Sequence, residues 1–470
     1  MASTRKFINL LCLSLFLAVS CVSTHKLPAI KQTSIEAKQW SKLDGVVHYS
    51  DWKPYAVTTI GGLKGFRQVS HGSQTIYGGD PERKFKSTGF YYTIRQANRW
   101  WIVDPAGNAS YNVAVNGVRP GNSARNEKSL QTKFGSEEAW ITETHKDLEA
   151  LGFNGTACWS EVPLIKYSNR KCSTPLCYTT ILGLWSGYVK QMKKEHAKEI
   201  TFSVFDTAFE AYVDNQAGKL SETRDDPALL GYFSDNELSF SPGILEDFLS
   251  LNDDQNPNYK AAKSWMARQG FTREAITDYQ RTMFLGVVAE KYYKVVSEAI
   301  KKHDPNHLYL GSRLHGKPKH NQHIVAAAGK YCDIISINYY GQWEPSVKHF
   351  TEWSKWADKP VIITEFYAKG DDSGLPNISG AGWRVKTQDD RGVFYENFCL
   401  KLLQMKNCVG WNWFRYMDND PTDTTADESN NDSNKGIVNN FYEYYQPLTT
   451  RMKELNDNKY NLIRYFDKSP

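Results

Sequence analysis

The sequence predicts a mixed α/β protein, namely a (β/α)8 TIM barrel with a small β-rich cap at its N-terminal side. Short apolar or β-branched runs alternate with segments of helical periodicity through most of the 470 residues, and this alternation indicates a parallel sheet. Eight such runs can be counted, which is the number of strands in a closed barrel. A doubly wound open sheet fits the same alternation and remains the alternative on periodicity alone.

The eight runs predicted as strands are rich in β-branched and aromatic residues. In chain order they are Tyr111–Asn116, Asn154–Trp159, Ile200–Asp206, Gly231–Asn236, His307–Ser312, Ile334–Tyr339, Val361–Thr364 and Val409–Trp413.

Amphipathic helices are predicted between these runs. Ser136–Leu151 is one, with its apolar residues on a single face. Met283–His303 is another, with apolar side chains recurring at a period near 3.6. It is expected to stop at Asp304-Pro305, because proline disfavours helical backbone at the residue before it.

The N-terminal part divides into an export signal, a tether and a β-rich region. Residues 1–21 join a positive start to an apolar run too short to span a bilayer, with small residues before Cys21. This favours a lipoprotein signal with lipid on Cys21 and an exported, membrane-anchored protein; plain secretion and an uncleaved anchor are alternatives. Residues 22–45 predict a tether. Residues 46–104 predict strands, including a hairpin over 90–103, and residues 105–470 predict the barrel.

Composition excludes some functions and suits others. A formal net charge of +5, with no dense Lys/Arg block, argues against a nucleic-acid partner. An aromatic content of 13%, with 14 Trp and 27 Tyr, fills cores and also suits a cleft that stacks sugar rings.

No metal or organic cofactor is expected. The cysteines lack the spacing of a zinc site, although Cys172 and Cys177 flank a short loop and are placed either to pair or to stay free. The acidic run Asp418–Asp423 lacks the glycine and distal Glu of an EF-hand. We interpret it as a solvated loop, with a bound cation as the alternative.

Two glutamates directly follow apolar runs, at the ends of the fourth and seventh predicted strands. They are Glu237, preceded by Asn236, and Glu365. Side chains at the C-terminal ends of barrel strands point into the mouth. Glycoside hydrolysis needs two facing carboxylates, one to protonate the leaving oxygen and one to attack the anomeric carbon or activate water. A single strand-end Glu more often caps a helix or pairs with a Lys, but two at these strands favour hydrolysis.

Asn-Glu after strand four and Glu after strand seven resemble the clan A glycoside hydrolases, which are retaining (β/α)8 enzymes. The resemblance implies that Glu237 is the acid/base and Glu365 the nucleophile. It also implies that Asn236 binds the sugar 2-hydroxyl. The catalytic cycle of such a pair requires no cofactor.

The same resemblance implies aromatic partners for the substrate and the nucleophile. A tyrosine after strand six holds the nucleophile in this clan, and Tyr340 is preferred to Tyr339. A tryptophan of strand eight floors the subsite of the attacked sugar, and Trp411 and Trp413 compete for that place.

Within the clan, the sequence is most similar to the β-agarases of glycoside hydrolase family 50. The similar segments are 100–107, 226–237, 359–366, 410–418 and 434–438. Two positions depart from the pattern, since Gln is expected near Arg415 and His near Asn412. These departures put agarose itself in question, so porphyran or a carrageenan stays open. An extra arginine suits a sulfated sugar.

Other strand ends supply further candidates for substrate binding. Asn116 ends the first run, Trp159 the second, and Arg313 and His315 follow the fifth. Each has a bland alternative, which is core packing for Trp159 and support of another side chain for the rest. Asp235 is expected to point away from Glu237, because neighbouring side chains along a strand alternate.

The leading interpretation is a retaining hydrolase of β-galactosidic bonds in a red-algal galactan such as agarose, with a polysaccharide or oligosaccharide as partner. A related clan A hydrolase of other β-glycans is the alternative among enzymes. A non-catalytic glycan-binding lipoprotein is the alternative from another class. An α/β protein with no role in sugars would need Glu237 and Glu365 far apart. Endo or exo action and the oligomeric state are not predicted.

Overall fold

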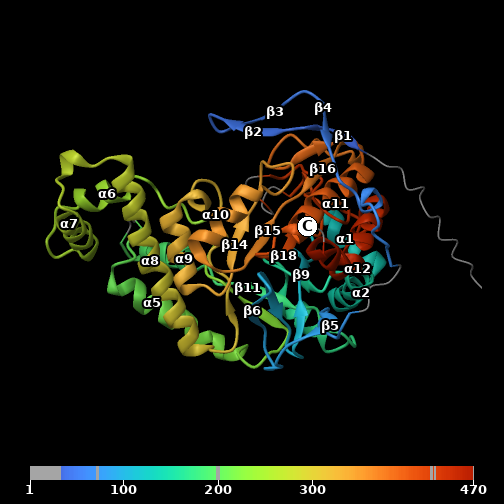
Figure 1. The fold of residues 1–470 in the computed structure, drawn as a ribbon, viewed down its shortest axis with the longest axis horizontal. Helices are drawn as coiled ribbons and strands as arrows, with labels where there is room; N and C mark the ends of the chain where they lie inside the picture. The colour runs from blue at the N-terminus through green and yellow to red at the C-terminus, as the bar shows by residue number, and fades with distance from the viewer. Residues whose placement is uncertain (1–32, 70–73, 197–201, 424–426, 428–429, 469–470) are drawn as a thin grey trace, which may run out of the picture.

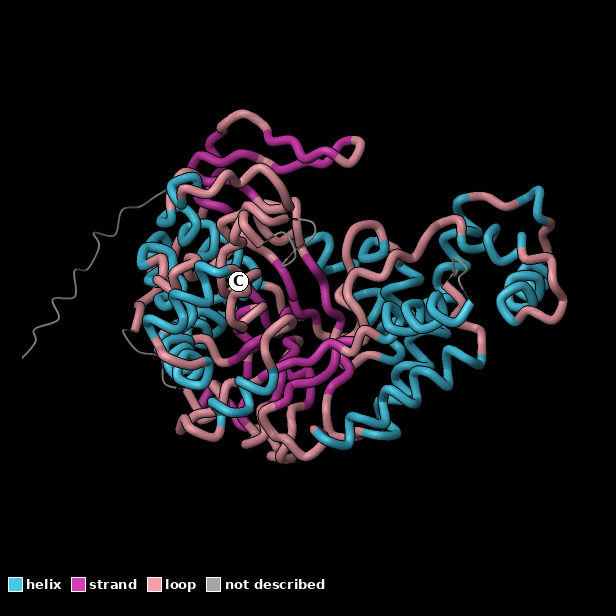
Figure 2. The backbone as a smooth tube through the Cα atoms, turned by 180° about the vertical axis from the view of Figure 1, so that it is seen from behind, coloured by secondary structure: helices cyan, strands magenta, loops and turns pink. Residues whose placement is uncertain are grey.

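The computed structural model describes residues 33–69, 74–196, 202–423, 427 and 430–468. The fold is a mixed α/β body in which central strands are flanked by helices (Figure 2). The predicted export signal, Cys21 and the first part of the predicted tether lie outside the described residues.

Parallel strands form two sheets at the centre of the fold. One has the order β10-β9-β18-β15-β14 and the other β11-β12-β13. Single parallel bridges, Gly155–Cys177 and Leu314–Ile337, lie between the two sheets. The ladders are therefore two open sheets and not the one continuous closed ladder that was predicted. The strands are β9 (Asn112–Val115), β10 (Gly155–Thr156), β11 (Tyr178–Ile181), β12 (Leu229–Phe233), β13 (Leu308–Tyr309), β14 (Ile335–Asn338), β15 (Val361–Glu365) and β18 (Cys408–Trp413).

Seven of the eight predicted strands coincide with these, and the third is wrong. The strand paired to β12 is β11, whereas Phe202–Asp206 forms no strand and leads into a helix that Asp206 caps. Phe202 packs on Trp185 with ring centroids 4.4 Å apart. The apolar side chains of the predicted run thus fill an aromatic layer under helices, a role that periodicity does not separate from a short strand.

Helices lie on both sides of the strands, with α5, α8, α9 and α10 on one side in Figure 1 and α1, α2, α11 and α12 on the other; α6 and α7 stand apart. Both predicted helices are present: α2 begins after the N-cap Ser136, and α8 ends directly before Asp304-Pro305. Within the described residues no helix has the length and apolar character of a membrane span. The helices are α1 (Ala124–Lys133), α2 (Glu137–Ala150), α3 (Val162–Asn169), α4 (Leu184–His196), α5 (Thr207–Ala217), α6 (Ile244–Ser250), α7 (Pro257–Gln269), α8 (Asp278–His303), α9 (Gln322–Tyr331), α10 (Val347–Ala357), α11 (Gln388–Gln404) and α12 (Gln446–Lys468).

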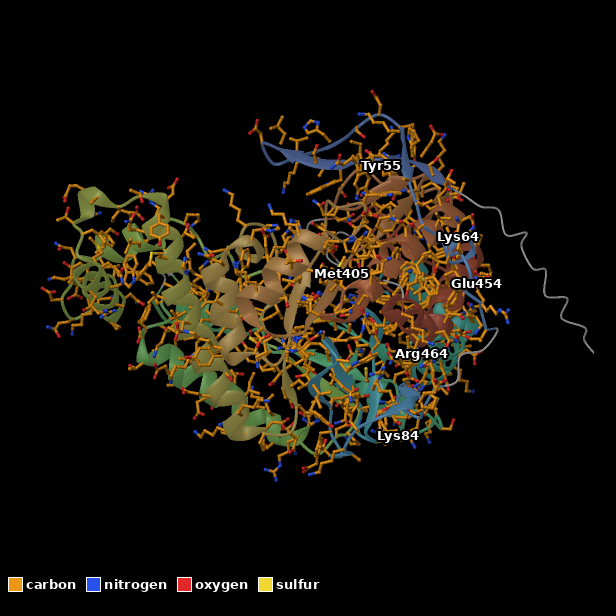
Figure 3. The ribbon with its side chains drawn as sticks, viewed as in Figure 1. Tyr55, Lys64, Lys84, Met405, Glu454 and Arg464 are labelled. Carbon is orange, nitrogen blue, oxygen red and sulfur yellow. The ribbon has the colours of Figure 1, made fainter. Side chains whose placement is uncertain are left out.

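The N-terminal strands form two separate four-stranded sheets and a β2-β3 hairpin, and not one cap. Tyr55 of the first sheet and Lys84 of the second lie at opposite sides of the molecule (Figure 3). The first has the order β16-β17-β1-β4 beside a β2-β3 hairpin, and the second has the order β5-β8-β7-β6. The strands are β1 (Ser34–Lys38), β2 (Trp40–Leu43), β3 (Val46–Tyr49), β4 (Lys53–Ala56), β5 (Asp80–Lys84), β6 (Tyr92–Gln96), β7 (Arg99–Val103), β8 (Asn108–Ser110), β16 (Ala368–Gly370) and β17 (Trp383–Val385).

The predicted tether is partly wrong, because β1 and β2 lie within it. Ile35 and Ala37 of β1 are buried at alternate positions, and β1 pairs with β17 far along the chain. An alternation of two apolar residues in a polar segment is too short to indicate a strand from sequence. The pairing comes from a distant strand and not from local propensity.

The two N-terminal sheets mark the two ends of the parallel strands. Trp100 N donates to Lys406 O at the start of β18, so the β5–β8 sheet lies at the base, where the strands begin. Trp343 Nε1 donates to Ala56 O (2.8 Å), which places β4 near the loop after β14. We call this end, where Asn116, Trp159, Glu237, Arg313 and Glu365 follow or end their strands, the mouth. The predicted hairpin is β6–β7, turned by Ala97 and Asn98, both with positive φ.

Of the two alternatives for Cys172 and Cys177, the structure has the unpaired one. Both are free thiols, and Asn112 Nδ2 donates to the buried Cys177 Sγ at 3.1 Å. Cys177 belongs to the bridge between the two parallel sheets, so its side chain is held among strands rather than in the loop that carries Cys172.

Candidate active site

Glu365 is the last residue of the fully buried strand β15 and is itself 5% exposed. Oε1 accepts a hydrogen bond from Arg313 Nη2, and Oε2 accepts one from the Tyr340 hydroxyl at 2.5 Å. Burial raises the pKa of Glu365, while the Arg313 charge and the Tyr340 hydrogen bond oppose this rise. The carboxylate is therefore held in one orientation with a donor on each oxygen.

Glu237 follows β12 and is more open to solvent than Glu365, with a side chain 33% exposed. Its φ of +53° turns the chain out of the strand, and its N–H donates to Ser312 O at 3.2 Å. Oε1 accepts from Asn338 Nδ2 at 2.7 Å, and His315 Nδ1 lies 3.9 Å away. A carboxyl group in this position can exchange a proton with a bound ligand.

A polar chain of side chains joins the two glutamates. Arg313 Nε donates to Asn236 Oδ1 at 2.9 Å while its Nη2 donates to Glu365. Asn338 Nδ2 donates both to Asn236 Oδ1, at 3.2 Å, and to Glu237 Oε1. The two glutamates are thus not far apart, as an α/β protein with no role in sugars would have required.

Asn338 is a residue that the sequence analysis missed. It is the last residue of β14, and its Oδ1 accepts from Thr364 Oγ1 at 2.7 Å. Its position near the end of a predicted strand was the available signal. The two tyrosines that follow Asn338 were the candidates considered there instead.

The mouth concentrates unusual backbone conformations. Trp159, Glu237 and Arg313 follow β10, β12 and β13 with φ values of +67°, +53° and +51°. Non-glycine residues rarely adopt positive φ, and such strain is found preferentially at functional sites. The Arg313 guanidinium carbon lies 6.0 Å from the centre of the Trp159 ring.

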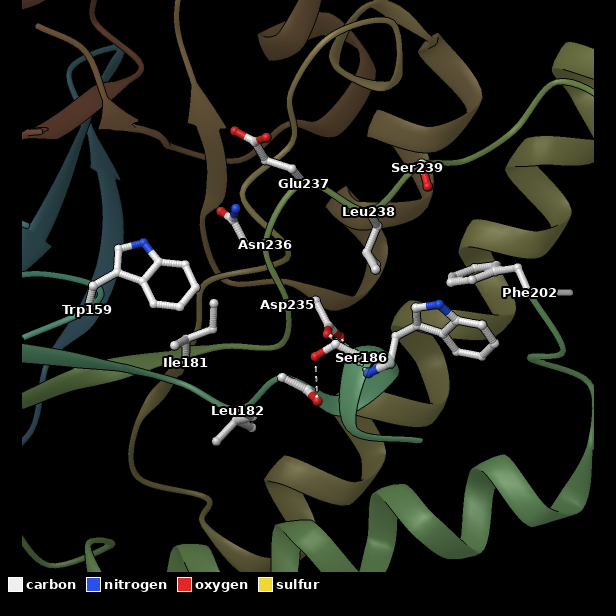
Figure 4. Close-up of a pocket in the computed structure, with 12 residues that line it drawn as sticks. Trp159, Ile181, Leu182, Ser186, Phe202, Asp235, Asn236, Glu237, Leu238 and Ser239 are labelled. Carbon is white, nitrogen blue, oxygen red and sulfur yellow. Dashed lines mark hydrogen bonds between the residues drawn. The ribbon is translucent and has the colours of Figure 1, made fainter. Parts of the chain in front are cut away.

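A cavity of about 530 Å³ opens beside Glu237, lined by both polar and aromatic side chains. Figure 4 shows Trp159, Asn236 and Glu237 on one side and Phe202 on the other. Trp159 is 40% exposed, so one face of its ring is available to a ligand. Aromatic surfaces with a few convergent polar groups are typical of ligand sites.

Two predictions about neighbouring residues are confirmed by the contacts. Tyr340 and not Tyr339 contacts Glu365, since the Tyr339 hydroxyl instead bonds with His349 Nδ1 at 2.9 Å. Asp235 points away from Glu237 and caps α4, where its carboxylate accepts from the N–H groups of Trp185 and Ser186. Burial raises the pKa of Asp235 to about 6.

The structure places neither candidate tryptophan of β18 in the cavity. Trp411 and Trp413 are fully buried; Trp411 Nε1 donates to the Tyr395 hydroxyl of α11 at 2.8 Å, and Trp413 Nε1 donates to Lys435 O at 2.9 Å. They are two residues apart in a strand, so both face the same side, and that side packs on α11. The prediction that one of them floors a subsite is wrong.

Asn116 and Arg415 both lie at the mouth, but they differ in whether their side-chain donors have hydrogen-bond partners. Asn116 is fully buried, and Nδ2 donates to the carbonyls of Thr364 (2.9 Å) and Trp413 (3.3 Å), so it braces the strand ends instead of facing open space. Arg415 is 9% exposed, and its Nε is buried with no hydrogen-bond partner. His315 and Trp159 are partly exposed and lie beside Glu237.

The acidic run Asp418–Asp423 is not the solvated loop that was predicted. Asp418 and Asp420 are each 3% exposed. Asp418 accepts from Gly436 N at 2.7 Å, and Asp420 accepts from Ser123 Oγ at 2.7 Å. Protein donors therefore occupy these carboxylates. Among the described residues no group of three His, Cys, Asp or Glu is placed to hold a metal ion.

Comparison with solved structures identifies the family. No family model matches the chain. The crystal structure of BpGH50 is 33% identical to it with a TM-score of 0.80, over 93% of this chain and 96% of that chain. The chain belongs to glycoside hydrolase family 50. Its candidate site is therefore that of a family 50 chain, with Glu237 and Glu365 at its centre.

More distant relatives agree with the family 50 assignment. β-Agarase B and β-agarase A of Vibrio sp. (strain JT0107) are 25% and 23% identical, each over 83% of this chain. The chain spans about half the length of these curated relatives, 50% and 48%. An agarase, AgWH50C, and an exo-β-agarase share the fold, with TM-scores of 0.70 and 0.71 at 22% and 21% identity.

Proposed function

We propose that this protein is a glycoside hydrolase that cleaves β-galactosidic bonds in a red-algal galactan of the agarose type. The observation that carries the proposal is the pair of glutamates joined through Arg313, Asn236 and Asn338 at the edge of an aromatic-walled cavity. Membership of family 50 and the agarase names of the relatives support the substrate class.

We further propose that the two parallel sheets work as one (β/α)8 barrel. The single bridges Gly155–Cys177 and Leu314–Ile337 lie where the edge strands of one sheet meet those of the other. Counting them as contacts gives a ring of eight parallel strands, and Glu237, Arg313 and Glu365 then lie at its C-terminal face, as in other barrel enzymes.

The proposed chemistry is a retaining double displacement. Glu365 attacks the anomeric carbon while Glu237 gives its proton to the glycosidic oxygen, so the C–O bond breaks and the leaving sugar departs neutral. Glu237, now ionised, takes a proton from water. The water oxygen attacks the anomeric carbon and frees Glu365, which restores both groups.

The surrounding residues have roles that follow from their contacts. Arg313 and the Tyr340 hydroxyl hold Glu365 as a carboxylate in spite of its burial. Asn338 and His315 orient Glu237. Asn236 takes the sugar 2-hydroxyl, and the exposed ring of Trp159 stacks on a sugar.

Export remains part of the proposal. A signal over residues 1–21 with lipid on Cys21 would bring the enzyme to a polymer that cannot enter the cell. Detection of a lipid-modified N-terminal cysteine by mass spectrometry of the mature protein tests this. A mature chain that begins at another residue would contradict it.

The experiment that tests the function is reducing-sugar release from agarose, porphyran, carrageenans, plant β-galactan and a mixed β-glucan, with Glu365→Ala run beside the native protein. Release from a red-algal galactan that the variant loses is the expected result. Release from plant glycans alone would show that the substrate is a plant glycan and not a red-algal galactan. No release from any glycan by folded protein would overturn the proposal in favour of a glycan-binding role.

A further inference from the structure

Two arginines lie together at the mouth, on the side of Glu365 that faces away from β14. Arg119 follows β9 and Arg415 follows β18, which are neighbours in the sheet. Arg415 is nine-tenths buried and lies against the backbone at Gly117, where a Cβ would stand 3.6 Å from Nε. Arg119 is partly exposed. Access from solvent is therefore through the Arg119 side of the pair.

Neither guanidinium has a hydrogen-bond or ion-pair partner in the part of the chain that the structure describes, and the Nε of Arg415 is buried without one. The two positive charges also act on each other. Burial first, and then the Arg119 charge, lower the pKa of Arg415 to about 10, so it remains a cation at neutral pH.

Nearby carboxylates offset this charge only from a distance. Asp418, Asp423 and Asp427 favour the charged form of Arg415 but make no ion pair with it. Asp427 contacts Lys435 Nζ at 2.6 Å, and Asp418 accepts from Gly436 N. A buried cation left without a contact partner is costly, and a ligand that supplies acceptor oxygens would remove that cost.

The arginine pair and Glu365 are related through neighbouring strands and through Lys435. Strand β18 lies between β9 and β15, which ends in Glu365. Lys435 lies beside Arg415, and its charge is felt by both Arg415 and Glu365. Its ammonium group stands over the Phe414 ring at 5.1 Å, next to Arg415 in the chain. Both arginines therefore follow strands at the same end of the sheet as Glu365.

We propose that Arg415 and Arg119 bind a sulfate ester on the galactan, so that a sulfated galactan is the preferred substrate class. This deepens the proposed function and rests on it. A sulfate ester presents three terminal oxygens that match the planar donor fork of a guanidinium and supplies the missing negative charge. A neutral hydroxyl would satisfy one N–H but leave two adjacent cations uncompensated.

The kinetic test compares one sulfated red-algal galactan with the same polymer after chemical desulfation. We expect kcat/KM of the native protein to be higher on the sulfated polymer. Arg415→Gln should reduce the ratio of the two values by about tenfold to a hundredfold, the size of a lost charge-assisted hydrogen bond, mainly through KM. Arg119→Gln should reduce it less, because Arg119 is more exposed.

Arg125→Gln is the matched control, because Arg125 starts the helix after β9 and pairs with Asp420 at 3.7 Å. It removes one positive charge from the same end of the molecule and should leave the ratio unchanged. Equal kcat/KM on both polymers, or an equal loss on both in Arg415→Gln, would overturn the sulfate proposal while the hydrolase proposal stands.

A binding experiment tests the sulfate site independently of hydrolysis. Calorimetry with Glu365→Gln and a sulfated galactan oligosaccharide should show binding that the added Arg415→Gln change weakens by at least about tenfold. If this weakening is found but the native protein hydrolyses no galactan, the hydrolase proposal is contradicted and the sulfate site stands. Inorganic sulfate that binds as tightly as the oligosaccharide would show a free-anion site and contradict recognition of an ester.

Discussion

One buried ionisable residue precedes strand β13 and another follows it, and the two ends differ in how completely their polar groups are paired. At the base, His307 Nδ1 lies 2.7 Å from Asp304 Oδ2 and Nε2 lies 2.9 Å from Asp226 O. Asp304 also accepts from the Tyr232 hydroxyl. At the mouth, Arg313 binds Asn236 and Glu365, but its Nη1 is buried without a partner.

The difference separates a stabilising network from a binding one. Buried polar groups in native proteins are nearly all hydrogen-bonded, so an orphan buried donor requires an explanation. At the mouth, Arg313 Nη1, Arg415 Nε and Asn116 Oδ1 are all unpaired. Function at the C-terminal ends of strands and stability at the other ends is the usual division of a barrel. The sugar of the proposed function would supply partners for these atoms.

The largest expected effect is loss of the proposed catalytic carboxylates. Glu365→Gln and Glu237→Gln should each lower kcat by at least about a thousandfold, because each removes one of the two groups that the chemistry needs. Initial rates of galactan hydrolysis measure this. Glu290→Gln is the control, since Glu290 pairs with Lys330 on the helical surface at 2.8 Å. A variant at either position with more than a tenth of native activity would refute its role.

Arg313→Lys is expected to lower kcat/KM by about a hundredfold, because an ammonium group cannot hold Asn236 and Glu365 in one planar fork. Arg313→Gln should also move the acid limb of the pH–rate profile upward. The Arg313 charge opposes the burial that raises the pKa of Glu365, so without it Glu365 takes up a proton at higher pH. An unmoved acid limb in Arg313→Gln would show that Arg313 does not act through Glu365.

Asp304→Asn tests the other end of the strand and should leave kcat/KM within about twofold while lowering the free energy of unfolding by about 2–4 kcal/mol. Urea unfolding measures the loss. Burial raises the pKa of Asp304, but hydrogen bonds from His307 and Tyr232 outweigh it and leave the pKa lowered. The stability of the native protein due to Asp304 is thus present above the ordinary aspartate pKa, about 3.9, and lost as the pH falls through its lowered value. A large loss of activity with an unchanged free energy of unfolding would contradict the stabilising role of this end of the strand.

The smallest effect is expected from a reducing agent. Cys172 and Cys177 are free, so dithiothreitol should leave the midpoint of thermal unfolding unchanged. Peptide mapping after alkylation should find both thiols modified. A peptide linked through these two cysteines would contradict the arrangement of Cys177 beside Asn112.

The order of strands and the strand-end glutamates were predictable because both depend on local patterns. Apolar runs located seven of the eight parallel strands, and Glu237 and Glu365 were found by asking which side chain follows each run. The third strand, Tyr178–Ile181, was missed because the apolar residues after Ile200, which pack under helices, show the same local pattern as a short buried strand. The two N-terminal sheets were not separable, since β1 of the first pairs with β17, hundreds of residues away.

Within the site, the sequence could not predict contacts between side chains that are far apart in the chain. The preference for Tyr340 over Tyr339 agrees with the contact to Glu365, although the resemblance to clan A offered both tyrosines. Trp411 and Trp413 failed because residues two apart share a face, and the sequence does not say whether that face meets a helix or the cavity. The pairing of Arg313 with Glu365 depends on two strands that are not adjacent in the chain, so no local pattern predicts it.

The most direct test of the central claim is the anomeric configuration of the first product, followed by proton NMR as the native protein cleaves a β-galactosidic bond. Glu365 as nucleophile and Glu237 as acid/base predict the β-anomer at the new reducing end first, with the α-anomer appearing later by mutarotation. An α-anomer formed first would show direct attack by water and contradict the nucleophilic role of Glu365.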